Sequence, residues 1–274
     1  MTGSGDIVNR NDRPWNPLAI DPVASRLSSY AAFQGGETVR PLAANRPAEQ
    51  ALCEAHDQVR RQVLGEGYPC VGARSAFNRL GYRFGLFPEL ASEGAVRAVC
   101  HDLYEFCHEF PVVDEQFITF IAMFRGPQIE SEQHFEDLLW RQLQSMHGVD
   151  SAFFSWDKAV NTDSANKDFS FSIGGRAMFI VGLHPKASRL ARTVTHPTLV
   201  FNLHEQFERL RERGKFETMK QMIRARDMAF QGSINPVLKN FGESSEARQY
   251  SGRAVPDDWK CPFHANQKQQ QETK

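Results

Sequence analysis

The stretch Phe169–Phe207, FSFSIGGRAMFIVGLHPKASRLARTVTHPTLVFNLHEQF, decides the fold of this chain. Two apolar runs flank Gly174 and Gly175, and a Gly-Gly pair in that setting predicts a two-residue hairpin turn, because glycine takes a positive φ without steric cost. The second run, Arg176–Leu183, hardly alternates, which is typical of a strand buried on both faces. It ends at His184, and the proline that follows keeps the chain from turning directly into a helix.

A third strand is predicted at Thr198–Asn202, and it leads through His204 into a helix. Arg189 and Arg192 lie in a basic segment between the second and third strands. We expect His184 and His204 to lie at the ends of buried strands, with the two arginines between them. Together these four side chains would form a pocket for a cofactor that carries negative charge. An isolated histidine more often caps a strand, and isolated arginines are more often surface charges.

Further elements are expected before and after this stretch. Phe117–Phe124 is a continuous apolar run and predicts another buried strand. The pattern therefore indicates an α+β fold with a single domain, in which a mixed or antiparallel sheet contains the central Gly-Gly hairpin and is covered by several helices. The expected helices run from about Pro47 to Leu64, Ala73 to Leu80, Ser92 to His108, Ser131 to His147, Leu203 to Arg213 and Phe216 to Phe230.

The chain divides into three parts by composition. Residues 1–45 contain four prolines and little periodicity, which predicts an irregular N-terminal arm. Residues 46–264 form the body, and residues 265–274 are a solvated tail. The part of the body after residue 231 is rich in turn formers, and long segments without periodicity tend to carry function.

Bulk properties exclude several classes of partner. The 274 residues carry 32 basic and 33 acidic side chains, so neither nucleic acid nor an acidic membrane is expected as a partner. No apolar run approaches the roughly 20 residues that cross a bilayer, and no signal peptide is visible. The five cysteines have no framework spacing and predict reduced thiols in a cytoplasmic protein, with Cys100 and Cys107 on the core face of a helix.

Two side chains are candidate ligands for iron. Cys261 lies in the sequence WKCPF, and a thiolate is a strong ligand for a soft metal or for haem iron. His184 is placed at the end of a buried strand, where a neutral imidazole could serve as an axial ligand or a general base. The alternatives at this point are a thiol beside a solvated tail and a histidine that caps a strand.

Six blocks of the chain are long, or ordered along it in a specific way. They are FRGP, SEQHFEDLLWRQLQSMHGVD, FSFSIGGRAMFIVGLHPKASRLAR, LVFNLHEQFERLR, IRARDMAFQGSINPVLKNFGESSEARQYSGR and WKCPF. Together they resemble the YqcI/YcgG family over roughly residues 60–263. This resemblance implies a haem-dependent oxygenase that hydroxylates nitrogen, including that of guanidine-containing amino acids in natural-product biosynthesis.

The resemblance also implies the cofactor. The chain would bind haem b and would use O2 and an external reductant, supplied by an electron donor, on a small amine or guanidine. Both His184 and Cys261 lie in family blocks. A thiolate ligand favours O–O cleavage, which supports Cys261. A buried strand fixes the position of His184 more firmly than an irregular segment fixes Cys261, so we favour His184 as the ligand. Arg189 and Arg192 are then expected at the haem propionates, with His204 as a further cofactor-binding histidine.

Substrate binding and assembly are less constrained. A carboxylate, either Glu132 or Glu205, would pair with the cationic group of the substrate. A homodimer is compatible with this interpretation. Two alternatives from other classes are a haem-binding sensor or carrier without turnover, in which two side chains close the iron, and a protein that binds a different ligand in an apolar pocket.

Overall fold

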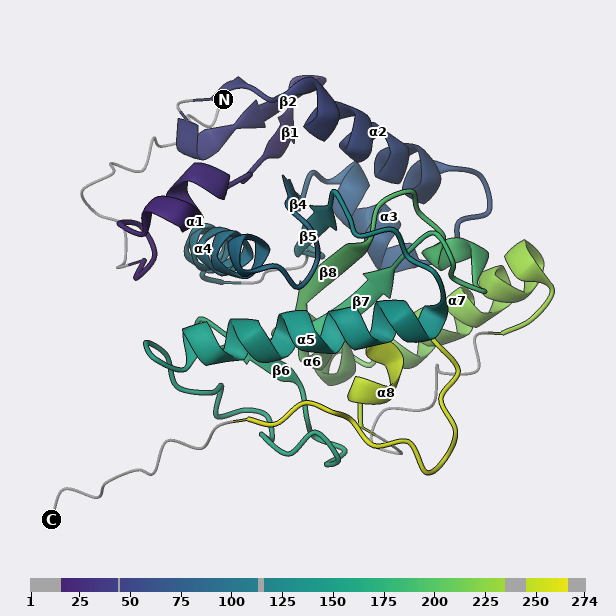
Figure 1. The fold of residues 1–274 in the computed structure, drawn as a ribbon. Helices are drawn as coiled ribbons and strands as arrows, with labels where there is room; N and C mark the ends of the chain where they lie inside the picture. The colour runs from purple at the N-terminus through teal and green to yellow at the C-terminus, as the bar shows by residue number, and fades with distance from the viewer. Residues whose placement is uncertain (1–15, 44, 113–115, 235–244, 266–274) are drawn as a thin grey trace, which may run out of the picture.

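The computed structural model describes residues 16–43, 45–112, 116–234 and 245–265. A five-stranded sheet with the order β4-β5-β8-β7-β6 lies at its centre (Figure 1). The β4–β5 pair is parallel and the other three pairs are antiparallel, so the predicted α+β fold with a mixed sheet is confirmed. The strands are β4 (Tyr82–Phe87), β5 (Thr119–Phe124), β6 (Phe171–Ile173), β7 (Arg176–Leu183) and β8 (Thr198–Leu203).

The predicted Gly-Gly hairpin joins β6 to β7. Ile173 pairs with Arg176, which leaves Gly174 and Gly175 as the two turn residues. Their φ angles are +59° and +72°, a conformation in which a side chain would be strained. The glycines therefore fix the register of the edge of the sheet, as the sequence predicts.

Helices cover both faces of the sheet (Figure 1). Along β5, Phe120, Ala122 and Phe124 face a core shared with α4 (Glu93–Glu109) and α5 (Glu132–Asp150). Ile121 and Met123 face the opposite core, which α2 and α3 close. The remaining helices are α2 (Gln50–Leu64), α3 (Val71–Asn78), α6 (Glu205–Glu212), α7 (Phe216–Gln231) and α8 (Ala247–Tyr250), and a 3-10 turn, η3, spans Leu190–Arg192.

The two longest helices begin where the sequence predicts. The Ser92 hydroxyl accepts a hydrogen bond from the amide of Ala95 at 3.3 Å, which caps α4. The Ser131 hydroxyl accepts one from the amide of His134 at 3.1 Å, which caps α5. Each cap satisfies an amide that has no partner inside its helix.

Part of the N-terminal arm is regular, so the prediction of an irregular arm is wrong for the described residues 22–43. Helix α1 (Pro22–Leu27) starts at Asp21, whose carboxylate accepts hydrogen bonds from two amides of the first turn. A small antiparallel sheet follows, and Gly35 and Gly36 turn its first hairpin with φ angles of +59° and +91°. This sheet consists of β1 (Ala32–Gln34), β2 (Glu37–Arg40) and β3 (Arg46–Pro47), with a 3-10 turn, η2, at Pro41–Ala43. Residues 1–15 and the expected tail from residue 266 lie outside the described residues.

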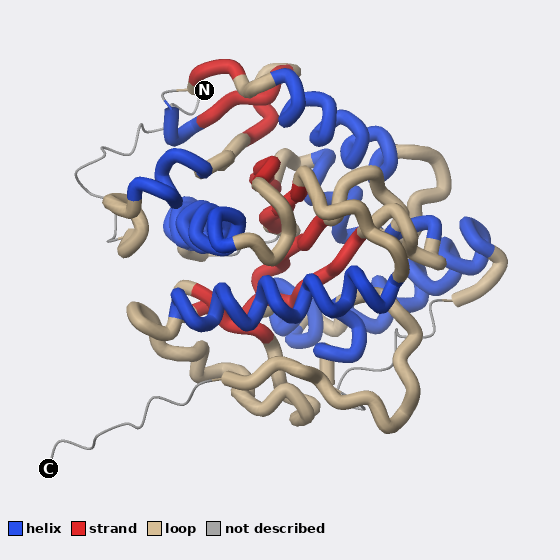
Figure 2. Tube along the Cα trace, viewed as in Figure 1, coloured by secondary structure: helices blue, strands red, loops and turns tan. Residues whose placement is uncertain are grey.

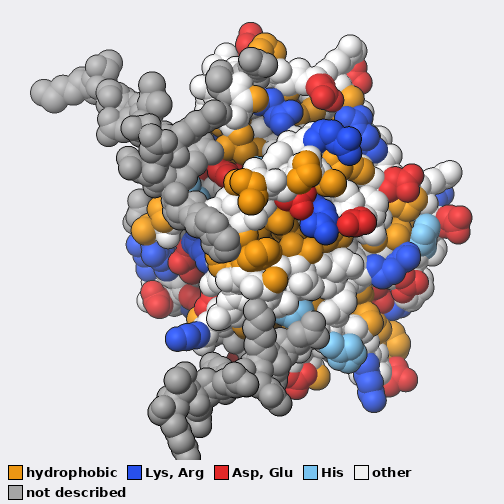
Figure 3. Space-filling model, turned by 60° about the vertical axis from the view of Figure 1, so that its left-hand side comes forward, with side chains coloured by type: hydrophobic (Ala, Val, Ile, Leu, Met, Phe, Trp, Pro, Cys, Tyr) orange, Lys and Arg blue, Asp and Glu red, His pale blue; other side chains and the backbone are white. Residues whose placement is uncertain are grey.

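The C-terminal segment after α8 has neither helix nor strand in its described part, as expected, and Figure 2 shows it as a long loop beside α5. Among the described helices, none has the length and apolarity needed to span a bilayer. On the face shown in Figure 3, acidic and basic side chains are interspersed among hydrophobic ones, in keeping with a net charge of −1. Neither positive nor negative charge therefore dominates this face.

Candidate functional site

His184 lies directly after β7 and is 1% exposed. Its ring stacks on Phe135 of α5 with a centroid distance of 4.2 Å, and its amide donates to the carbonyl of Arg192 at 2.9 Å. Burial lowers the pKa of His184 to about 4, so its imidazole is neutral at pH 7. The buried Nδ1 has no hydrogen-bond partner. A neutral imidazole with an unsatisfied ring nitrogen has the chemistry of a metal ligand.

Glu132 lies at the same end of the sheet as His184. Its carboxylate accepts a hydrogen bond from the amide of Ser188 at 2.9 Å, and its charge raises the pKa of His184 against the effect of burial. A pocket of about 340 Å³ opens beside this loop, lined by Pro185, residues 193–195 and residues of α2. The loop after β7 is thus bounded by a carboxylate on one side and by a pocket on the other.

Arg189 is engaged in a buried ion pair. Its guanidinium lies 2.6 Å from the Asp227 carboxylate and donates to the hydroxyl and the carbonyl of Ser233, each at 2.7 Å. These contacts join the loop after β7 to the end of α7. A haem propionate at Arg189 would have to displace Asp227.

Arg192 is equally enclosed. It is 8% exposed, and burial lowers the pKa of its guanidinium to about 10. Its donors bind backbone carbonyls of Gly182, Gln249 and Tyr250 at 3.1–3.2 Å. The two arginines therefore hold the loop that carries His184 against α7 and α8, and neither presents a free guanidinium for the expected propionate contact.

His204 lies at the opposite end of the sheet from His184. In the antiparallel pair, Leu183 lies opposite Thr198, and β8 must run six residues further to reach His204. At the rise of a β-strand this separates the two histidines by about 20 Å. The expected pocket that contains both histidines is therefore wrong, because the strands that carry them run in opposite directions.

Acidic side chains face both ring nitrogens of His204. Nε2 lies 3.0 Å from a carboxylate oxygen of Glu208, and Nδ1 lies 3.6 Å from one of Glu246. Glu205, the second candidate for the substrate cation, is in the same region and is paired with Arg176. His204 and Glu205 are thus apart from His184 and Glu132, and both are already engaged, His204 with Glu208 and Glu205 with Arg176.

Cys261 packs against the aromatic core beside α5. Burial raises the pKa of its thiol to about 11, although the amide of Phe263 and the hydroxyl of Ser164 act in the opposite direction. The thiol is therefore protonated at pH 7 without a metal, and ligation of iron would require it to lose that proton. Among the described residues, no three His, Cys, Asp or Glu side chains are grouped to hold a metal ion.

Sequence reasoning did not single out Glu246. This residue precedes the short helix α8, is 5% exposed, and has a carboxyl oxygen, Oε2, without a hydrogen-bond partner. Burial raises the pKa of Glu246 to about 8. Its surroundings come from distant parts of the chain, so no local pattern could have indicated it.

A family model, described as the YqcI/YcgG family, matches residues 59–264, which is about three quarters of the chain. The chain belongs to the YqcI/YcgG family. The match contains the whole five-stranded sheet together with His184, Glu246 and Cys261, whereas α1 and β1–β3 precede it. No curated protein matches the chain, and no solved structure matches it.

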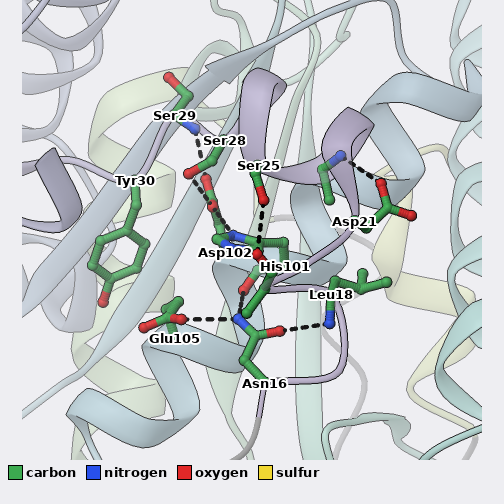
Figure 4. Close-up of polar contacts among 12 residues, drawn as sticks. Asn16, Leu18, Asp21, Ser25, Ser28, Ser29, Tyr30, His101, Asp102 and Glu105 are labelled. Carbon is green, nitrogen blue, oxygen red and sulfur yellow. Dashed lines mark hydrogen bonds and ion pairs between the residues drawn. The ribbon is translucent and has the colours of Figure 1, made fainter. Parts of the chain in front are cut away.

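The N-terminal part outside the YqcI/YcgG match is fastened to α4 by the polar cluster of Figure 4. The buried carboxylate of Asp102 accepts hydrogen bonds from the Ser28 hydroxyl at 2.7 Å and the Ser29 amide at 2.8 Å, and lies 2.8 Å from Nδ1 of His101. The Ser28 hydroxyl binds the carboxylate and not the imidazole, so the cluster lacks the geometry of an activated nucleophile. It is a structural clasp.

Asp102→Asn is expected to lower the free energy of unfolding by about 2–3 kcal/mol, because hydrogen bonds to a buried charged group are lost or weakened. Urea denaturation measures this change. Asp137→Asn, on the exposed face of α5, is the matched control and should leave the free energy unchanged. Equal midpoints for the two variants would contradict the clasp.

Proposed function

We propose that this member of the YqcI/YcgG family is a haem-dependent oxygenase that hydroxylates nitrogen of a small amine or a guanidine-containing amino acid. The family resemblance supports the class of reaction, and O2 and an external reductant are its co-substrates. The observation that carries the assignment of the site is the neutral, buried imidazole of His184, whose Nδ1 has no partner. His184 is the residue that would hold the haem iron.

The residues around His184 fit an iron ligand, although they do not supply the expected propionate contacts. Phe135 stacks on the ring, and the backbone bond to Arg192 fixes where the loop starts. When bound, haem supplies the binding and activation of O2. Arg189 and Arg192 serve as positioning residues, because their ion pair and carbonyl contacts hold the loop that carries the ligand.

Glu132 is the better of the two candidates for the cationic group of the substrate. It lies at the His184 end of the sheet and contributes to the electrostatic field at that ring. Glu205 lies at the other end and is neutralised by Arg176. A carboxylate near the ligand would orient the amine or guanidine while its nitrogen is oxidised.

Haem titration of the purified chain, followed by a ferrous–CO difference spectrum and a turnover assay with O2, reductant and L-arginine or methylguanidine, tests the proposal. Stoichiometric haem binding, a CO band of the histidine-ligated type and a product heavier by one oxygen atom would support it. A chain that leaves the haem spectrum unchanged is not a haem protein. A haem complex that binds neither CO nor O2 would instead indicate the sensor or carrier.

Cys261→Ser is expected to leave the ferrous–CO band unmoved, because His184, and not the buried thiol of Cys261, is the proposed ligand of the iron. Cys53→Ser, in α2, is the control for changing a half-buried thiol. A shift of the band in Cys261→Ser alone would transfer the ligand role from His184 to Cys261.

A further inference from the structure

Glu246 carries an unsatisfied carboxyl group in the interior. Oε2 is buried and has no hydrogen-bond partner, and Oε1 lies 3.6 Å from Nδ1 of His204. The hydroxyl of Ser170, which donates to the carbonyl of Met178 at 3.1 Å, acts on this carboxyl group and lowers its pKa. A buried polar atom without a partner is costly, and in a native chain it indicates a missing water, ion or ligand.

Arg211, whose positive charge lowers the pKa of Glu246, is already paired. Arg211 bonds to Glu208 and lies over the ring of Phe216 at 4.4 Å. Asp157, which also acts on His204, accepts hydrogen bonds from the amides of Ala177 and Ala159. If Glu246 ionised, the cluster would therefore carry one negative charge without a partner.

Burial of this uncompensated group raises the pKa of Glu246 to about 8. At pH 7 about nine tenths of the chains would then hold the proton on this carboxyl. Arg211 lowers the pKa of Glu246 and Glu208 raises it, so the neighbouring charges largely oppose each other. A cation that reached Oε2 would take the place of the proton.

We propose that Glu246 binds a small organic cation, either an alkylammonium or a guanidinium, through its unpartnered Oε2. The donors of such a cation match the available acceptors, which are Oε2 and the Ser170 hydroxyl oxygen. A metal ion fits less well, because the described residues offer no group of three side chains able to hold one. The cation would tie the start of α8 to the residue that precedes β6.

This site is separate from the proposed haem site. Glu246 contacts His204, which lies about 20 Å from His184 at the opposite end of the sheet. A cation bound here is therefore not the nitrogen oxidised at a His184-bound iron. The inference does not depend on haem, and it would stand if the chain bound none.

Isothermal titration calorimetry of the full chain with methylguanidine, and separately with butylamine, tests the site. Each titration is made at pH 7 in two buffers of different ionisation enthalpy, so that proton release can be measured. Each is repeated with and without added haem. We expect release of close to one proton for each cation bound. Glu246→Gln should weaken binding about tenfold or more and abolish the proton release. Glu212→Gln, an exposed change in α6, is the matched control and should behave as the native chain.

The pH dependence adds a second measurement. The affinity of the native chain should rise about tenfold from pH 6 to pH 7 and about fivefold from pH 7 to pH 8, because a smaller fraction of the chains then holds a proton that the cation must displace. The charged and titratable groups around Glu246 are His204, Glu208, Arg211 and Tyr250, and Asp157 acts on His204. Burial lowers the pKa of His204 and raises that of Tyr250 far above this window.

Glu246→Gln should show a flat profile in the same pH range. Binding of either cation without proton release, or equal affinity of Glu246→Gln and the native chain, would overturn the assignment. Absence of binding by both cations would also overturn it. The proton release is measured on the native chain, so it decides the matter even if Glu246→Gln does not fold.

Discussion

Glu136→Gln is expected to lower the free energy of unfolding by about 3 kcal/mol. The Glu136 carboxylate is 2% exposed and accepts four hydrogen bonds from the C-terminal segment. Its donors are the Ser251 hydroxyl at 2.7 Å, the Arg253 guanidinium at 2.6 and 3.2 Å, and the Trp259 indole at 3.1 Å. An amide in its place leaves a guanidinium without a charged partner, and breaking a buried ion pair costs about 3–5 kcal/mol.

Urea denaturation monitored by Trp fluorescence and by circular dichroism measures the loss. Arg253 keeps some contact with solvent, which places the expected value at the lower end of that range. Glu130→Gln, just before α5 and exposed, is the matched control and should change the free energy by less than about 0.5 kcal/mol. A loss below 1 kcal/mol in Glu136→Gln would show that the C-terminal segment is held mainly by its aromatic contacts.

His184→Ala is expected to weaken haem binding at least about a hundredfold, because the proposed axial ligand is removed. Added imidazole should restore the spectrum of the haem complex by entering the space left by the side chain. A purely structural role of His184 would not give this rescue. Haem titration with and without imidazole, alongside circular dichroism to confirm folding, makes the measurement.

His196→Ala is the control for His184→Ala. His196 is half-buried in the loop before β8, at the same end of the sheet, and burial lowers the pKa of its ring as well. It should bind haem as the native chain does. An unchanged spectrum in His184→Ala would remove the proposed ligand, and loss of haem in both variants would point to damage of the whole loop region.

Local signals in the sequence predicted most of the sheet and helices. The Gly174-Gly175 turn and the serine caps of α4 and α5 act through neighbouring residues, so a short window contains their cause. Strand β4 was missed because Gly85 weakens its pattern. In the structure, a Cβ on Gly85 would lie 2.6 Å from the ring of Phe87, so close packing requires the glycine.

The candidate site was harder to predict because its contacts join distant parts of the chain. In the sequence nothing near Arg189 indicates its partner, because the fold brings Asp227 beside it from 38 positions away. Two of the carbonyls that bind Arg192 likewise belong to residues 57 and 58 positions later. The sequence is enough to place His184 at the end of a strand, but it does not show at which end of the sheet His204 lies. The register of β7 on β8, which separates it from His204, is a tertiary property.

The segment after α8, which runs along α5, also affects the order in which parts of the protein fold. Trp140 of α5 lies against Tyr250, Trp259 and Phe263, more than a hundred residues downstream. During synthesis, α5 and the strands emerge long before the segment that covers them, so the aromatic face of α5 stays exposed to solvent until that segment has followed. Completion of this part of the core therefore waits for a segment made more than a hundred residues after α5, and until then its aromatic side chains are a surface that chaperones could bind.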